Sequence, residues 1–392
     1  KEGFYKFSLI PYLKLRATYG YSGNVDPSMS AVTTIQYEDN NPYTTFPMSK
    51  VFNFFNPELR WEKVGMLNIG IDFRTTNNAF SGNIDYYLKK GTDLYGTIPI
   101  DYTAGLGTEF VTKNVASLKG SGLDIQLEAS IIKTKLFYWT TVFNLNYYSD
   151  KVLSYYQSLD IGGRYVTGSG LISITPLERK PVYAMLSYPW AGLNHETGDP
   201  QGYLHKEKSV DFFSLTGSGT KAADLIYSGH IMPTLSGSLG NAFSFKGFSL
   251  SARFTYKFNC YFRKSSIDYA SLFNGYASHS DFTKRWKSPG DEIQIDIPSM
   301  TYPASHSRDL FYMGSETLVR RGDHIRLQYV NFSYEIKSRW LVRAHINNLR
   351  LYANLNNIGI IWRKNVERVD PDFSDNAILM SKTFSLGGQV VF

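Results

Sequence analysis

Apolar and polar residues alternate along ten separate stretches of the chain. The alternation is clearest at residues 248–258, where Phe248, Leu250 and Phe254 alternate with Ser249 and Arg253. The same period-two pattern occurs at residues 13–19, 67–74, 80–89, 123–131, 139–147, 235–245, 330–336, 349–356 and 383–392. Successive side chains of a β-strand point to opposite faces. The pattern therefore predicts about ten strands, each with one apolar and one polar face.

The connections between these stretches alternate in length. Short links at 75–78, 133–135, 246–247 and 337–346 alternate with long ones at 22–58, 90–120, 149–232, 260–325 and 359–380. Outer-membrane barrels have tight turns on the periplasmic side and long loops outside. The pattern predicts an all-β fold, a transmembrane antiparallel β-barrel with long extracellular loops and both ends of the sheet on the periplasmic side. A strand-like run at 181–190 is expected inside a folded loop, because one more spanning strand would break the parity.

Composition agrees with strands that face lipid on one side. Aromatic residues make up 16% of the chain and charged residues only 19%, and no apolar run approaches the ~18 residues of a transmembrane helix. The net charge of +7 does not indicate nucleic-acid binding, because Lys and Arg are scattered rather than clustered. The single Cys260 excludes an intrachain disulfide and a Cys-based zinc site.

Charged residues on the polar faces are candidates for lining a water-filled lumen. These residues are Lys14, Arg16, Asp85, Asp124, Glu128, Arg253, Lys257 and Arg350. If ten strands form an open sheet, its two edges would leave unpaired N–H and C=O groups in hydrocarbon. Further strands are then needed to complete the ring.

Several segments carry a family resemblance. They are YLKLRATYGYSGN at 12–24, NPELRWEK at 56–63, NVASLKGSGL at 114–123, AGLN at 191–194, TGDP at 197–200, and LRLY at 349–352 leading to Asn356 and Asn357. The chain ends on an alternating apolar strand with Phe392 as its last residue. In this order, the segments resemble the C-terminal half of SusC/RagA-type TonB-dependent outer-membrane transporters.

The resemblance implies a barrel of about 22 strands with a plugged lumen. It also implies a TonB box that reaches the TonB–ExbB–ExbD complex and a SusD-like surface lipoprotein as a lid. The cargo would be oligosaccharides or peptides, Phe392 would signal to the barrel assembly machinery, and no cofactor is expected. By subtraction, residues 1–392 would be the C-terminal part of the barrel in the outer membrane of a Gram-negative bacterium. The plug, the TonB box and about twelve N-terminal strands would lie outside this chain.

Aromatic residues in the long connections are candidates for cargo contact. Tyr155, Tyr156, Trp190, Tyr261 and Trp286 have rings that stack on sugars or grip peptide side chains. The alternative is that these rings pack the loops together or belong to an interfacial aromatic belt.

The sequence does not favour an enzyme. It contains no HExxH motif and no nucleophile elbow, and His195 beside Glu196 and Asp199 fits a polar turn better than a metal cluster. Active import, which the resemblance implies, is the favoured function. The alternatives are a structural or passive-pore barrel that scaffolds a surface assembly, and a soluble β-sandwich adhesin.

Overall fold

The computed structural model describes most of the chain. The described residues are 5, 7–25, 32–53, 55–101, 103, 110–156, 160–166, 176–276, 278–338, 341, 345–373 and 379–392. No helix among them is long and apolar enough to cross a membrane.

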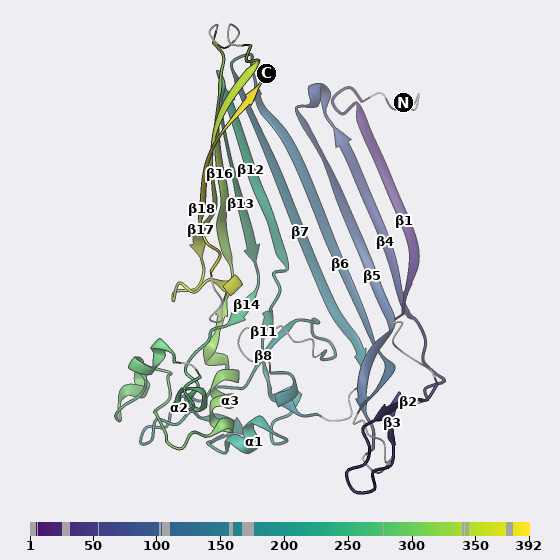
Figure 1. Cartoon of the computed structure of the whole chain (residues 1–392), viewed down its shortest axis with the longest axis vertical. Helices are drawn as coiled ribbons and strands as arrows, with labels where there is room; N and C mark the ends of the chain where they lie inside the picture. Colours follow the sequence, from purple (N-terminus) through teal and green to yellow (C-terminus); the bar gives the residue numbers. More distant parts are fainter. Residues whose placement is uncertain are drawn as a thin grey trace.

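Ten antiparallel strands form one continuous curved sheet (Figure 1). In sheet order they are β1 (Tyr12–Asn24), β4 (Glu62–Arg74), β5 (Phe80–Pro99), β6 (Phe110–Lys133), β7 (Phe137–Tyr155), β12 (Leu235–Phe245), β13 (Phe248–Phe258), β16 (His324–Ile336), β17 (Asn348–Arg363) and β18 (Thr383–Val391). Each strand contains one of the ten alternating stretches, and β1 begins at the same end of the sheet at which β18 ends. The predicted all-β fold of ten antiparallel strands and its parity are thus confirmed.

The pairing register brings residues of one kind together across the sheet. One row runs through Leu15, Ile71, Ile84, Ile125, Leu145, Gly237 and Tyr256, whereas the next row runs through Lys14, Asp72, Asn83, Gln126, Asn144, Ser238 and Thr255. A shift of one residue in any pair would mix these rows. The register therefore gives the sheet one apolar face and one polar face.

The apolar face is exposed rather than covered by another layer. Leu15 is 72% exposed, Leu351 48% and Phe384 61%. An apolar surface that extends across a whole sheet is disfavoured in water and marks contact with lipid or protein.

Aromatic rings gather on the apolar face near the short turns. The rings of Phe248 and Tyr334 stack with centroids 4.1 Å apart, and Trp139 lies 5.4 Å from Phe243. The Trp139 indole N–H donates to Asn241 Oδ1 at 3.0 Å, so its polar group is satisfied on an otherwise apolar surface. Such a belt is expected where a barrel meets the lipid headgroups.

The short turns are fixed by local backbone chemistry. Lys246 and Gly247 join β12 to β13 with φ values of 46° and 88°, the combination that a two-residue type I′ hairpin requires. A Cβ on Gly247 would also lie 2.7 Å from the Glu335 carbonyl oxygen. Glycine at this position is therefore required by the turn and by the approach of the next hairpin.

The strands are longer than the sequence pattern indicates. The connection predicted at 90–120 consists largely of strand, because β5 continues to Pro99 and β6 begins at Phe110. The Asn114 side chain stabilises this extension by accepting from the Arg60 N–H at 2.8 Å and donating to the Arg60 carbonyl oxygen at 2.7 Å. The connection at 22–58 likewise contains a hairpin of β2 (Thr34–Glu38) and β3 (Met48–Asn53).

The described residues of 160–232 and 260–322 fold together at the end of the sheet opposite the short turns (Figure 1). We call them the loop cluster. It contains α1 (Phe212–Thr216), α2 (Tyr269–Phe273) and α3 (His306–Gly314). It also contains the strand pairs β8 (Ala184–Ser187) with β11 (Ile226–His230), β9 (Gly202–Leu204) with β10 (Glu207–Ser209), and β14 (Tyr261–Arg263) with β15 (Val319–Arg321). The strand-like run at 181–190 thus belongs to a folded loop, as predicted.

Candidate functional site

The polar face carries all eight charged residues predicted to line the lumen. Each lies on a strand of the ten-stranded sheet, and the register assigns each to the polar face. The strands bring some of them into contact and leave others apart.

Arg16 links two neighbouring strands on this face. Its guanidinium lies 2.8 Å from Asp72 Oδ1 and 2.9 Å from Asp85 Oδ2. Asp85 Oδ1 and Asn68 Oδ1 nearby are buried and have no hydrogen-bond partner in the described part of the chain. Buried acceptors normally find a donor, so this part of the polar face is suited to contact a donor-bearing group.

The other charged candidates have separate partners. Asp124 accepts from Asn146, Arg350 donates to Ser333 Oγ at 3.0 Å, and Arg253 lies over the Tyr329 ring. The described part of the chain offers Glu128 no ion pair. The polar face therefore carries several separate local networks of polar side chains.

An ionic cluster binds the connection between β17 and β18 to the polar face. Lys257 Nζ lies 2.7 Å from Asp372 Oδ1, and Arg326 Nη2 lies 2.8 Å from Asp370 Oδ1. The buried His324 contributes Nε2 at 3.4 Å from Asp372 Oδ2. Partial burial opposes ionisation of Asp372, but hydrogen bonds from His324 and Lys257 outweigh burial and lower its pKa.

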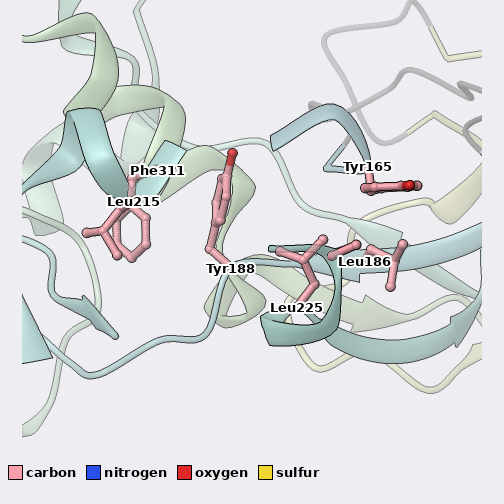
Figure 2. Close-up of a cluster of buried hydrophobic side chains, with 7 residues drawn as sticks. Tyr165, Leu186, Tyr188, Leu215, Leu225 and Phe311 are labelled. Carbon is pink, nitrogen blue, oxygen red and sulfur yellow. The ribbon is translucent and has the colours of Figure 1, made fainter. Parts of the chain in front are cut away.

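The loop cluster has its own hydrophobic core. Phe311 is fully buried among Tyr188, Trp190 and Phe212, with ring centroids 5.5 to 6.4 Å away. Figure 2 shows the Phe311 and Leu215 side chains beside Tyr188, and Leu186 with Leu225 towards Tyr165. Tyr269 and Tyr312 belong to a second buried group beside it.

Two buried arginines hold the loop cluster together. Arg263 donates to the Leu186 and Ser315 carbonyl oxygens, each at 2.8 Å. Burial lowers the pKa of Arg263 to about 10. Arg308 Nε donates to Asp199 Oδ1 at 2.7 Å. These contacts join segments far apart in sequence, so the loop cluster is an ordered tertiary structure rather than a set of independent loops.

The aromatic candidates fall in different environments. Trp190 is part of the loop core, and Trp286 is buried with its indole N–H donating to Glu292 Oε2 at 3.1 Å. Tyr261 lies beneath the Arg321 guanidinium. Tyr156 is 58% exposed and lies, with Tyr155, at the end of β7. Tyr156 is the most accessible of the five for contact with a solute.

Titrating groups at two further places in the loop cluster have shifted pKa values. His195 Nδ1 lies 2.6 Å from Glu292 Oε1, and this hydrogen bond raises the pKa of His195 and lowers that of Glu292 to about 2. Asp309 is buried in α3, and its burial raises its pKa to about 6 although it accepts the Ala270 N–H. The described residues contain no cluster of three His, Cys, Asp or Glu that could hold a metal.

Sequence reasoning missed the residues that organise these sites. Arg263 and Arg308 lie in predicted loops, and the alternating stretch at 330–336 does not extend to His324 and Arg326. The sequence shows that Arg326 is charged but not that Asp370 is its partner, because Asp370 is distant in the sequence and follows a different strand.

Comparisons with known proteins agree with this geometry. TonB-dependent receptor P3 of Formosa agariphila is 24% identical over 379 residues, covering 91% of this chain and 36% of that receptor. TonB-dependent receptor SusC of Bacteroides thetaiotaomicron is 30% identical over 162 residues, covering 39% of this chain and 16% of SusC. The structure of the RagAB peptide transporter matches 99% of this chain and 42% of the matched one, with a TM-score of 0.72 at 19% identity. The chain is thus similar in sequence and in fold to SusC/RagA-type TonB-dependent transporters.

The chain spans about two fifths or less of the length of the curated relatives that it matches. No protein-family model matches it. Its relatives are receptors and transporters rather than enzymes, and proteins of this kind lie in the outer membrane of Gram-negative bacteria, the location predicted for this chain.

Proposed function

We propose that this chain forms the C-terminal part of the barrel of an active importer energised through TonB. The observation that carries the proposal is the continuous apolar face of the ten-stranded sheet, set against a continuous polar face. In a barrel, the apolar face meets lipid and the polar face encloses a water-filled passage. The eight charged residues of the polar face would then line that passage.

Two features support a ring completed by protein outside residues 1–392. β1 and β18 each have only one neighbour in the described sheet, and an unpaired strand edge is costly in hydrocarbon. The acceptors Asn68 Oδ1 and Asp85 Oδ1 lack donors in the described part of the chain. Additional strands would pair with the edges, and a plug inside the ring would supply donors to these acceptors.

The loop cluster provides a platform for a lipoprotein lid. Phe273 and Tyr302 meet edge to face at 5.1 Å, and Tyr302 and Tyr276 are about 80% exposed. Exposed aromatic groups on a rigid support are typical of protein interfaces. We assign this surface to a SusD-like lid, beneath which oligosaccharide or peptide cargo would be captured.

The test is cargo uptake by cells that express the complete transporter with its lid. Fluorescent oligosaccharides and peptides are supplied to a strain with TonB and to an isogenic strain without it. Uptake that requires TonB and stops with a protonophore supports the proposal. Uptake that continues without TonB identifies a passive pore, and folded protein that takes up nothing under any condition identifies a scaffold.

A paired variant tests the lid surface. Replacing Tyr276 and Tyr302 with serine should reduce co-purification of the lid without loss of folded barrel. The control is replacement of the exposed Ile293, also in the loop cluster, with serine. Equal lid recovery from the two variants would reject the assignment of this surface.

A further inference from the structure

A hollow of about 930 Å³ lies at the loop end of the polar face, where β13, β16 and β17 meet the connection to β18. Its lining combines charged groups with apolar side chains, including Phe373, Leu379 and Met380. The ionic cluster of Asp370 and Asp372 with Arg326 and Lys257 fixes one of its walls. The hollow is therefore bounded by strands and by an anchored connection.

Positive charge is in excess around this hollow. Five cations line it, namely Lys257, Arg326, Arg363, Arg368 and Lys382, against the two carboxylates Asp370 and Asp372. Lys257 and Arg326 already pair with these carboxylates. Arg363, Arg368 and Lys382 form no ion pair among the described residues, although Arg363 donates to the Arg368 carbonyl oxygen. The described lining thus carries three more positive than negative side chains.

The backbone departs from regular pairing beside these charges. Leu327 pairs with Gly359 and Tyr329 with Asn356, so Gln328 faces two residues of β17. Gly359 has a φ of 126°, and a Cβ added there would meet nothing within 4 Å. Position 359 thus favours glycine because of its backbone conformation, and not because a side chain there would clash with neighbouring atoms. Bulges of this kind redirect side chains and are common beside binding sites.

We infer that this hollow is a binding site for a carboxylate or sulfate group carried by the cargo. Guanidinium groups bind such anions through paired, charge-assisted hydrogen bonds. The apolar lining suits the body of the molecule that carries the anion. The inference rests on the proposed function, since cargo entering from the loop end would meet this site early in its passage.

Acidic peptides and acidic oligosaccharides share this chemistry, and a binding experiment separates them. The complete purified transporter is titrated calorimetrically with pentaglutamate and trigalacturonate, and with pentaglutamine and maltotriose as neutral counterparts. At least one acidic probe should bind roughly tenfold or more tightly than its neutral counterpart, as charge-assisted contacts predict. The acidic probe that binds identifies the source of the anion.

Charge-neutralising variants locate the site. R363Q/R368Q/K382Q should weaken binding of the acidic probe by about tenfold or more. The control K208Q/K284Q/K287Q removes three exposed lysines of the loop cluster and should bind as the unmodified protein does. R368Q and K382Q are also made singly, because Arg363 donates to the Arg368 carbonyl oxygen and the triple variant could perturb the local fold.

The inference is overturned if neither acidic probe exceeds its neutral counterpart, or if R368Q, K382Q and the folded triple variant bind it as tightly as the control does. TonB-dependent uptake of a neutral cargo by the triple variant separates the two proposals. If that uptake persists while acidic discrimination is absent from the unmodified protein, only the anion site is rejected. If no uptake depends on TonB in the unmodified protein, the proposed function itself fails.

Discussion

Replacement of Phe311 with alanine tests whether the loop cluster is stabilised by its own core. Phe311 is fully buried and contacts three aromatic rings, those of Tyr188, Trp190 and Phe212. Truncating a buried phenylalanine costs about 3–5 kcal/mol through lost burial and the cavity that remains. The neighbouring Phe213 is 82% exposed, and surface substitutions usually change stability by less than about 0.5 kcal/mol. Phe213→Ala is therefore a matched control one residue from a core contact.

Hydrogen exchange measured by mass spectrometry on the complete transporter gives the free energy of local opening. A loss of 3–5 kcal/mol corresponds to exchange about 100- to 5000-fold faster in the amides of α1 and α3, at 1.36 kcal/mol per tenfold. Exchange in β12 and β13 should not change, because Phe311 belongs to the loop core and not to the sheet. Equal exchange in α3 of the Phe311→Ala and Phe213→Ala variants would refute a cooperative core.

Two other predictions concern the titration of Asp309 and the orientation of the sheet. Because burial raises the pKa of Asp309 from 3.8 to about 6, the contribution of this carboxyl to the stability of the loop cluster is greatest below pH 4 and should fall by roughly 3 kcal/mol as the pH rises from about 4 to 6. Asp309→Asn should flatten this dependence in hydrogen exchange, and an unchanged slope would show that another group titrates. Leu355→Arg, on the apolar face towards the middle of β17, should cost about 2–4 kcal/mol when the barrel refolds into liposomes, whereas Asn354→Arg on the polar face should cost much less. Similar losses for both would contradict the assignment of the faces.

The strands were predictable because the period of a membrane strand is local. Leu250 and Arg253 lie within four positions of each other, and the alternation alone assigns them to opposite faces of the strand without knowledge of any distant partner. Strand ends were less predictable. β5 and β6 continue beyond their alternating stretches because they pair with each other from Leu94 to Pro99, and the Asn114 side chain ties this extension to Arg60, 54 residues away in the sequence.

The interior of the loop cluster was not predictable either, because its contacts join residues that are far apart in the sequence. Arg263 is held by the Leu186 and Ser315 carbonyl oxygens, and backbone acceptors have no signature in the sequence. Trp190 could be named as a functional aromatic, but only its three-dimensional neighbours reveal that it contributes to the core. The excess of charge around the hollow depends likewise on β16 and β17 being adjacent.

Site-directed spin labelling in lipid bilayers tests the central claim that the apolar face meets hydrocarbon and the polar face meets water. Labels are placed singly at Leu250, Leu351 and Phe384 on the apolar face, and at Arg253 and Arg350 on the polar face, in a background without native cysteine. Collisions with molecular oxygen should dominate at the first three positions, and collisions with a water-soluble nickel complex should dominate at the two arginines. The reverse pattern, or labels at Leu250, Leu351 and Phe384 that reach neither reagent, would show that the apolar face is buried in protein and that the chain is no part of a membrane barrel.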